Sequence, residues 1–72
     1  MIRKKSIGVY LGKCVVISDL PNTTVYKVEE IEQLRIRLSY RAGRETIQAG
    51  WWDIRMLQEP TKEQLNNAGY VA

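Results

Sequence analysis

Four arginines fall within ten residues in the middle of the chain: Arg35, Arg37, Arg41 and Arg44. A guanidinium group carries a permanent positive charge and a planar fork of N–H donors, which suits it to phosphate oxygens. Gathered along one hairpin, the four groups are candidate contacts for the phosphates of RNA or single-stranded DNA. Three carboxylates lie just before them in the chain: Glu29, Glu30 and Glu32. Pairing with these glutamates is the alternative, and it would leave a solvated face with little net field.

Aromatic side chains are the second set of candidate binding groups. Tyr10, one of the adjacent pair Trp51 and Trp52, and Tyr40 if it faces outward can stack on unpaired bases. The same residue types dominate protein interfaces, so an exposed tryptophan beside Tyr70 is also a candidate patch for a protein partner or a second copy of the chain. Packing in the core or at its rim is the third possible role of these rings.

The sequence lacks the residue sets of common catalytic sites. It has no histidine and one cysteine, Cys14, which excludes Ser/His and Cys/His nucleophile pairs, an internal disulfide and a thiolate zinc site. The carboxylates show no spacing typical of a paired acid and base or of a metal cage. We therefore expect a protein that is not an enzyme and holds no cofactor or metal, with Cys14 buried as a small apolar side chain.

Length and charge narrow the class of protein. The chain has 72 residues, which suffices for one domain, and its 11 Lys and Arg against 8 Asp and Glu give a net charge of +3. This mild basic excess is compatible with a polyanionic partner. No apolar run is long enough for a signal peptide or a membrane span, so we expect a cytoplasmic protein without a membrane partner.

Alternating polarity predicts the strand that positions the arginines. Over residues 34–40 apolar and polar side chains alternate strictly, which is typical of a strand with one face in a core and one in water. This predicts a central strand with Arg35 and Arg37 on the wet face. Residues 13–18 and 24–31 are predicted as the preceding strands, because they are rich in β-branched residues, and residues 19–23 are predicted as a loop.

Side-chain parity predicts how the second and third strands pair. If paired positions sum to 64, Val28 lies opposite Ile36 and Glu29 lies opposite Arg35, so that apolar residues share one face. A two-residue turn at residues 32–33 would instead mix apolar and charged side chains on both faces. The sequence therefore predicts a three-residue connection or a β-bulge at residues 31–33.

The second half of the chain predicts a strand, a tight helical turn and a helix. A turn at residues 41–44 leads to a strand at residues 45–49, which Gly50 is expected to break. Asp53 is the expected cap of a single 3-10 turn, and of the two adjacent tryptophans one should be buried and the other exposed. Thr61 and Gln64 form a predicted capping box for a helix that ends near Gly69.

These elements predict a mainly β fold, a small barrel of about five strands over residues 1–60, followed by a short helix and tail over residues 61–72. Between Gly12 and Leu57 the chain resembles the SH3-like small barrels, including those with a KOW-type pattern. The resemblance rests on a glycine before the first strand, a long loop, a basic-apolar central strand, and a closing tryptophan and leucine: Gly12, residues 19–23, residues 35–38, Trp52 and Leu57. It implies a non-catalytic module that binds RNA, DNA or peptides.

Two further families share shorter patterns with the chain. The run at residues 36–38, after a glycine-led strand, resembles the carbon storage regulator proteins, which are dimeric RNA binders. Residues 50–52 are Gly, Trp and Trp where that family has an RNA-contacting arginine. The run at residues 47–49 is similar to part of the V-Q-I-Y run of plasmid-type dihydrofolate reductases, without its tyrosine. No site of either family is assigned to this chain.

Overall fold

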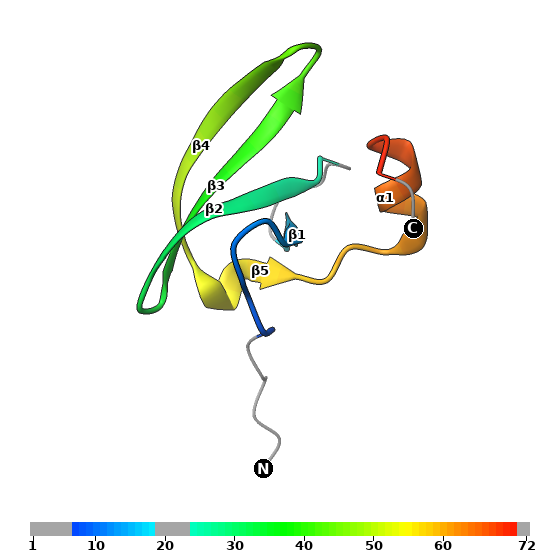
Figure 1. The fold of residues 1–72 in the computed structure, drawn as a ribbon. Helices are drawn as coiled ribbons and strands as arrows, with labels where there is room; N and C mark the ends of the chain where they lie inside the picture. Colours follow the sequence, from blue (N-terminus) through cyan, green and yellow to red (C-terminus); the bar gives the residue numbers. More distant parts are fainter. Residues whose placement is uncertain (1–6, 19–23, 71–72) are drawn as a thin grey trace.

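The computed structural model describes residues 7–18 and 24–70 of the chain (Figure 1). Five described strands form one antiparallel sheet in the order β4-β3-β2-β1-β5. They are β1 (Cys14–Ile17), β2 (Tyr26–Glu32), β3 (Arg35–Ala42), β4 (Glu45–Asp53) and β5 (Leu57–Gln58). The 3-10 helix η1 (Ile54–Met56) joins β4 to β5, and helix α1 (Lys62–Asn67) follows β5. The predicted mainly β fold, with about five strands and a short C-terminal helix, is confirmed.

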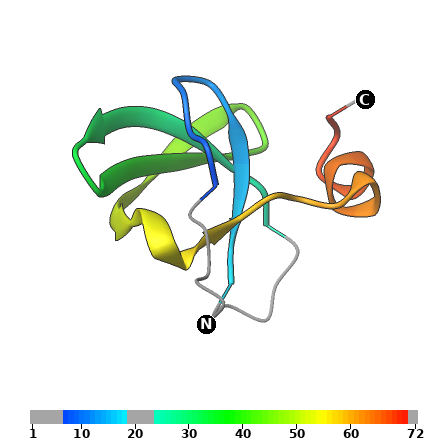
Figure 2. The ribbon, with the colours of Figure 1, turned by 90° about the horizontal axis from the view of Figure 1, so that it is seen from below.

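The core lies on one face of the curved sheet. Its centre comes from β3, where Ile36 and Leu38 are fully buried at alternate positions, as their period of two requires. Because β1 pairs with both β2 and β5, the chain after η1 returns beside β1 and closes over the same core (Figure 2). Ile7 and Val9 pack against this core without forming a strand. Cys14, expected to be buried, is only half-buried because it opens β1 at the margin of the core.

The predicted connection between the second and third strands is wrong. The turn contains two residues, Gln33 and Leu34, so Glu32 lies opposite Arg35 in place of the expected Glu29. Gln33 has a φ of 56°, in the left-handed region that side chains other than glycine rarely adopt. The turn is therefore as tight as a type I′ or II′ hairpin but lacks the glycine or asparagine that usually signals one.

A β-bulge inside β2, and not the expected one at residues 31–33, keeps the apolar side chains of β2 and β3 on one face. Val28 lies opposite Leu38 and not opposite Ile36, and the register then shifts by one residue, which leaves Glu29 as the extra residue. The bulge places Val28 on the core side while Glu29 and Glu30 both face outward. Strict alternation, which the register prediction assumed, fails at this point because two polar residues follow each other.

Strand β4 does not end at Gly50 as expected. It continues to Asp53 through a second bulge, in which the register shifts after the pair Gly50 and Leu38 and leaves Ala49 extra. Gly50 has a φ of 84°, which glycine adopts without the penalty of a Cβ atom. The extra residue reverses the parity of the strand, and the tryptophan at position 51 therefore faces outward while its neighbour faces the core.

The two predicted helix caps are confirmed. Asp53 accepts a hydrogen bond from the backbone N–H of Arg55 at the start of η1. Thr61 and Gln64 form a complete capping box at the start of α1, and Gly69 ends that segment with a φ of 89°. No residue of α1 itself is fully buried, so the helix lies beside the sheet and contributes little to the core (Figure 2).

The predicted loop over residues 19–23 lies outside the described residues. Within the described ranges, neither helix has the length or the apolar character that crossing a bilayer would need.

Candidate functional site

Three adjacent strands present their polar side chains on the face opposite the core, which we call the outer face. Residues that lie directly opposite each other in an antiparallel ladder share a face, so the registers assign its members. Glu29, which has no partner in the ladder, is assigned by its hydrogen bond from Ser39. Its members are Lys27, Glu29, Glu30 and Glu32 from β2, Arg35, Arg37, Ser39 and Arg41 from β3, and Thr46, Gln48, Trp51 and Asp53 from β4. The outer face thus mixes both signs of charge.

Arg37 is committed to contacts within the sheet. Its Nε and Nη2 donate to Glu30 Oε1 at 3.1 and 3.0 Å, and its Nη1 donates to Gln48 Oε1 at 2.6 Å. These partners come from the strands on either side of β3. The charge of Arg37 is therefore largely compensated, and the glutamate pairing considered as the alternative for the arginines is present here.

Arg35 lies over an aromatic ring. Its guanidinium carbon is 5.7 Å from the ring centroid of Trp51, within the range of a cation–π contact. Glu32 and Asp53 lie opposite Arg35 on the two neighbouring strands. Among the ion pairs of the described residues none involves Arg35, but two carboxylates at this level lower the local positive potential.

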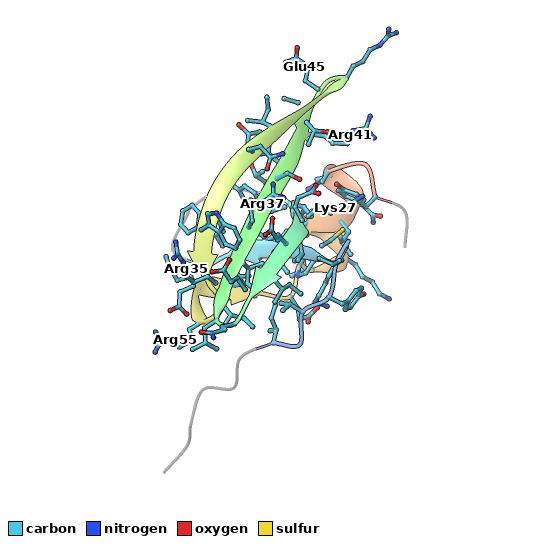
Figure 3. All side chains as sticks on the ribbon, turned by 60° about the vertical axis from the view of Figure 1, so that its left-hand side comes forward. Lys27, Arg35, Arg37, Arg41, Glu45 and Arg55 are labelled. Carbon is cyan, nitrogen blue, oxygen red and sulfur yellow. The ribbon has the colours of Figure 1, made fainter. Side chains whose placement is uncertain are left out.

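Arg41 and Arg44 differ from the first two arginines. Both are exposed, and within residues 7–18 and 24–70 neither side chain makes a hydrogen bond or an ion pair. They lie toward the far end of the β3–β4 hairpin, where Arg41 and Glu45 are visible in Figure 3, while Arg35 and Arg55 lie at its other end. The structure therefore divides the predicted row of four arginines into two pairs. Arg37 and Arg35 have side-chain partners, which are Glu30 and Gln48 for the first and the Trp51 ring for the second. Arg41 and Arg44, which we call the free pair, have no side-chain partner among the described residues.

The charge around the free pair is net positive. Within residues 39–48, which we call the distal hairpin, Arg41 and Arg44 are accompanied by one carboxylate, Glu45. Lys27 lies opposite Ser39 and adds a third basic group at its base. On β2, the carboxylate of Glu29 accepts a hydrogen bond from Ser39 Oγ at 2.5 Å.

The opposite end of the hairpin is held by a compact ion pair. Arg55 Nη2 and Nε donate to the two carboxylate oxygens of Asp53 at 2.7 and 2.9 Å. These side-chain hydrogen bonds, the backbone hydrogen bond from Arg55 and its charge lower the pKa of Asp53 from the usual 3.8 to about 2. Asp53 raises the pKa of Arg55 in return. The pair stabilises η1 and offers no free charge to a ligand.

The candidate aromatic residues do not form one patch. Trp52 is half-buried against the core and its Nε1 donates to Ala49 O at 2.8 Å, whereas Trp51 is 37% exposed, so the prediction of one inward and one outward tryptophan is confirmed. Tyr10 is 63% exposed and lies under Lys13, away from both. The ring of Tyr70 contacts the ammonium group of Lys27 instead of the tryptophans.

A cavity of about 380 Å³ separates the distal hairpin from α1. Its polar and aromatic lining comes mainly from two segments that are far apart in sequence. Tyr40 and Arg41 belong to β3, whereas Asn67 ends α1 and Tyr70 follows it. Thr24, Val25 and Ala68 complete the wall. No local pattern in the sequence points to Asn67, because its place in the cavity wall depends on how α1 lies relative to β3.

A second cavity of about 330 Å³ lies between the start of β1 and α1. Lys13 and Glu59 both line it, and their side chains form an ion pair at 2.9 Å. The charges on its wall therefore compensate each other, which distinguishes it from the cavity beside Arg41.

Neither protein families, nor curated proteins, nor solved structures match this chain. The site must accordingly be interpreted from its own geometry. Over the described part of the chain, no three or more Cys, Asp or Glu side chains lie together in a way that could hold a metal ion. What the described residues do offer is the unpaired guanidinium group of Arg41 in a cavity wall that also contains Tyr40 and Tyr70, an arrangement suited to binding anions that carry flat apolar groups.

Proposed function

We propose that this chain is a non-catalytic binding module, an SH3-like small barrel, that contacts the phosphates of RNA or single-stranded DNA through its distal hairpin. The observation that carries the proposal is the pair Arg41 and Arg44, whose guanidinium groups are exposed and without partners among the described residues. Five strands, two-residue turns at residues 33–34 and 43–44 and a one-turn helix before the last strand support the barrel assignment.

The proposal gives the two pairs of arginines different roles. Arg41 and Arg44 supply phosphate contacts, because their side chains have neither an ion pair nor an aromatic ring as a partner among the described residues. Arg37 and Arg35 organise the outer face, the first by bridging Glu30 and Gln48 and the second by covering Trp51. Electrostatic affinity is therefore expected from two guanidinium groups and not from four.

Salt dependence of binding tests this count. We would titrate a mixed pool of short labelled RNA and single-stranded DNA with the protein and follow fluorescence polarisation at about 50 and about 200 mM salt. Two phosphate contacts to a single strand predict a slope of log affinity on log salt near −1.4, a loss of about sevenfold over this range. Four contacts would give a loss of about fiftyfold. Absence of saturable binding at the lower salt would overturn the proposal.

Two matched variants distinguish a specific contribution of the distal hairpin to binding from the effect of the protein's overall charge. Arg44→Gln and Lys62→Gln each remove one positive charge from an exposed side chain, but only Arg44 lies in the distal hairpin. We expect Arg44→Gln to flatten the salt slope by about 0.7 and Lys62→Gln to leave it nearly unchanged. Equal effects of the two variants would mean that the hairpin has no special part in binding.

A protein partner, or a second copy of the chain, is the second candidate, and one observation favours it. Trp51 is exposed on an edge strand with Arg35 stacked on it, and Trp and Arg are the residues that most often dominate protein interfaces. This role predicts binding or self-association that is insensitive to salt and is lost in Trp51→Ala. The same variant should leave oligonucleotide binding by the distal hairpin intact.

A further inference from the structure

We propose that the cavity between β3 and α1 holds one unpaired nucleotide, with its phosphate on Arg41 and its base against Tyr70 and Tyr40. The inference rests on the proposed function, since it assigns to the distal hairpin a subsite for the base as well as contacts for the phosphates. The cavity brings residues 24–25, 40–41, 67–68 and 70 together, and no local sequence pattern predicts that they meet.

The charge of the cavity selects an anion. Among residues 7–18 and 24–70, Arg41 is the one charged residue that lines it, and no carboxylate of these residues does. The ammonium group of Lys27 lies 5.6 Å from the ring of Tyr70 and adds a second positive charge close to the wall. Figure 3 shows Arg41 on β3 and Lys27 on β2, both on the side of the sheet toward α1. A phosphate beside Arg41 would meet an uncompensated guanidinium group, which binds it in a bidentate manner.

The aromatic rings of the cavity are held in place before any ligand arrives. The ring of Tyr40 packs edge to face on that of Tyr26, with centroids 5.6 Å apart and an interplanar angle of 80°. Tyr70 is fixed by its contact with Lys27 and by a backbone hydrogen bond of 2.8 Å to Leu65 O. Rings that need no ordering on binding make good stacking surfaces for a base.

The size and polarity of the cavity favour a single base over a base pair. A volume of about 380 Å³ lies at the lower end of the range for small-molecule sites, and it suits one nucleotide. Asn67 lines the wall with an amide group that can both donate to and accept from the edge of a base. A base that is already paired could not present this edge, so the ligand is single-stranded.

The neighbouring cavity serves as an internal comparison. It has a similar volume, about 330 Å³, and it shares Tyr70, but its basic residue Lys13 is paired with Glu59. An anionic ligand would have to break that ion pair to gain a charged contact. We therefore assign the nucleotide to the cavity beside Arg41.

A comparison of two single-stranded oligonucleotides tests the base subsite separately from the phosphate contacts. One labelled single strand carries bases, and the other has the same length and phosphates but abasic sugars. We expect the protein to bind the first about tenfold more tightly, which is the effect of one base stacked on an aromatic ring. Tyr70→Leu should remove that difference, and Tyr10→Leu, which alters an exposed tyrosine away from the cavity, should keep it.

The result for the two strands also separates this inference from the proposed function. Equal binding of both strands, still weakened by Arg44→Gln, would overturn the base subsite and leave the proposed function standing. Binding of neither strand would overturn both.

A second variant is needed because Tyr70→Leu could act by unfolding α1 and not by removing the stacking surface. Ala68 is exposed at the end of α1 and lines the cavity, so Ala68→Met fills the space without removing a packing contact. It should abolish the preference for the strand with bases while thermal unfolding stays close to that of the unaltered protein. Retention of the preference in this variant would overturn the subsite.

Amide chemical shifts give a readout that does not depend on oligonucleotides. Adenosine 5′-monophosphate at millimolar concentration should move the amide signals of residues 40–41 and 67–70, and ribose 5-phosphate should move only that of Arg41. Shifts confined to the cavity beside Lys13, or no shifts at all, would contradict the assignment.

Discussion

Arg37 lies opposite Glu30 in the β2–β3 ladder, and two of its nitrogens donate to one oxygen of that carboxylate, at 3.1 and 3.0 Å. The geometry exists because the bulge at Glu29 turns two successive glutamates outward. A strand without the bulge would have placed Glu30 on the core side. The pairing of charge on the outer face is thus a consequence of backbone register.

Release of Arg37 should strengthen oligonucleotide binding. Glu30→Gln removes the carboxylate that compensates the guanidinium group, so a third phosphate contact becomes available and the salt slope should steepen by about 0.7. The cost in stability should stay below about 1 kcal/mol because the ion pair is exposed to solvent. Polarisation titrations at two salt concentrations measure the slope. Glu63→Gln on α1 makes the same change in net charge, and an equal effect there would contradict the prediction.

Gln33→Gly should stabilise the fold. Gln33 holds a φ of 56°, which costs an ordinary residue about 1–2 kcal/mol, and glycine avoids that penalty at a smaller entropic cost. We expect a gain of about 0.5–1 kcal/mol in the free energy of unfolding, measured by urea denaturation. The converse change, Gly43→Ala, should lose about 1 kcal/mol at a φ of 65°, although an added Cβ would meet open space. Destabilisation by Gln33→Gly would refute the argument from backbone strain.

The two tryptophans should behave differently when each is replaced by phenylalanine. Trp51→Phe should remove most of the acrylamide-quenchable fluorescence and change stability by less than about 0.5 kcal/mol, since that ring is exposed. Trp52→Phe should lower stability by about 1–2 kcal/mol, because it loses packing against the core and the hydrogen bond to Ala49. Quenching titrations and urea melts distinguish the two. Similar quenching of both variants would show that the bulge does not separate the rings.

Asp53 should make stability depend on pH in the acid range. Its pKa is about 2 in the folded chain and near the usual 3.8 when unfolded, so its ionised form favours the native state. This contribution is nearly complete above about pH 5 and is lost as the pH falls through about 2. The stability gap between the unaltered protein and Asp53→Asn should therefore narrow over that interval and be constant above it. Urea midpoints of the two proteins between pH 2 and pH 6 measure this difference in stability. A difference that stays the same over the whole range would show that the hydrogen bonds from Arg55 do not matter.

Local signals in the sequence were sufficient for most of the elements. The alternation at residues 34–40 marks β3, and the caps at Asp53 and Thr61 mark η1 and α1, because each of these depends on residues within a few positions of one another. The bulges were harder to predict. Val28 and Ile31 enclose two consecutive polar residues, which is the pattern that a bulge at Glu29 produces, but the same pattern also fits a strand end.

The candidate site was less predictable than the fold. The four arginines were identified by type and spacing, but which of them keep a free charge depends on partners from β2 and β4 that only the register reveals. Arg37 has its partners on both neighbouring strands, and Arg41 has none within the described residues. The cavity beside Arg41 depends on how α1 lies against the hairpin, which no local pattern encodes.

The bulge at Ala49 also bears on aggregation. Strand β4 has nine residues and forms one edge of the sheet, where unpaired backbone groups can recruit a strand from another molecule. The bulge divides this edge into residues 45–48 and residues 50–53, so neither regular stretch exceeds four residues. Stacked cross-β structure grows from flat segments of about six or seven residues. Because of this one extra residue, β4, the longest of the described strands, has no regular stretch long enough to template the growth of a fibril.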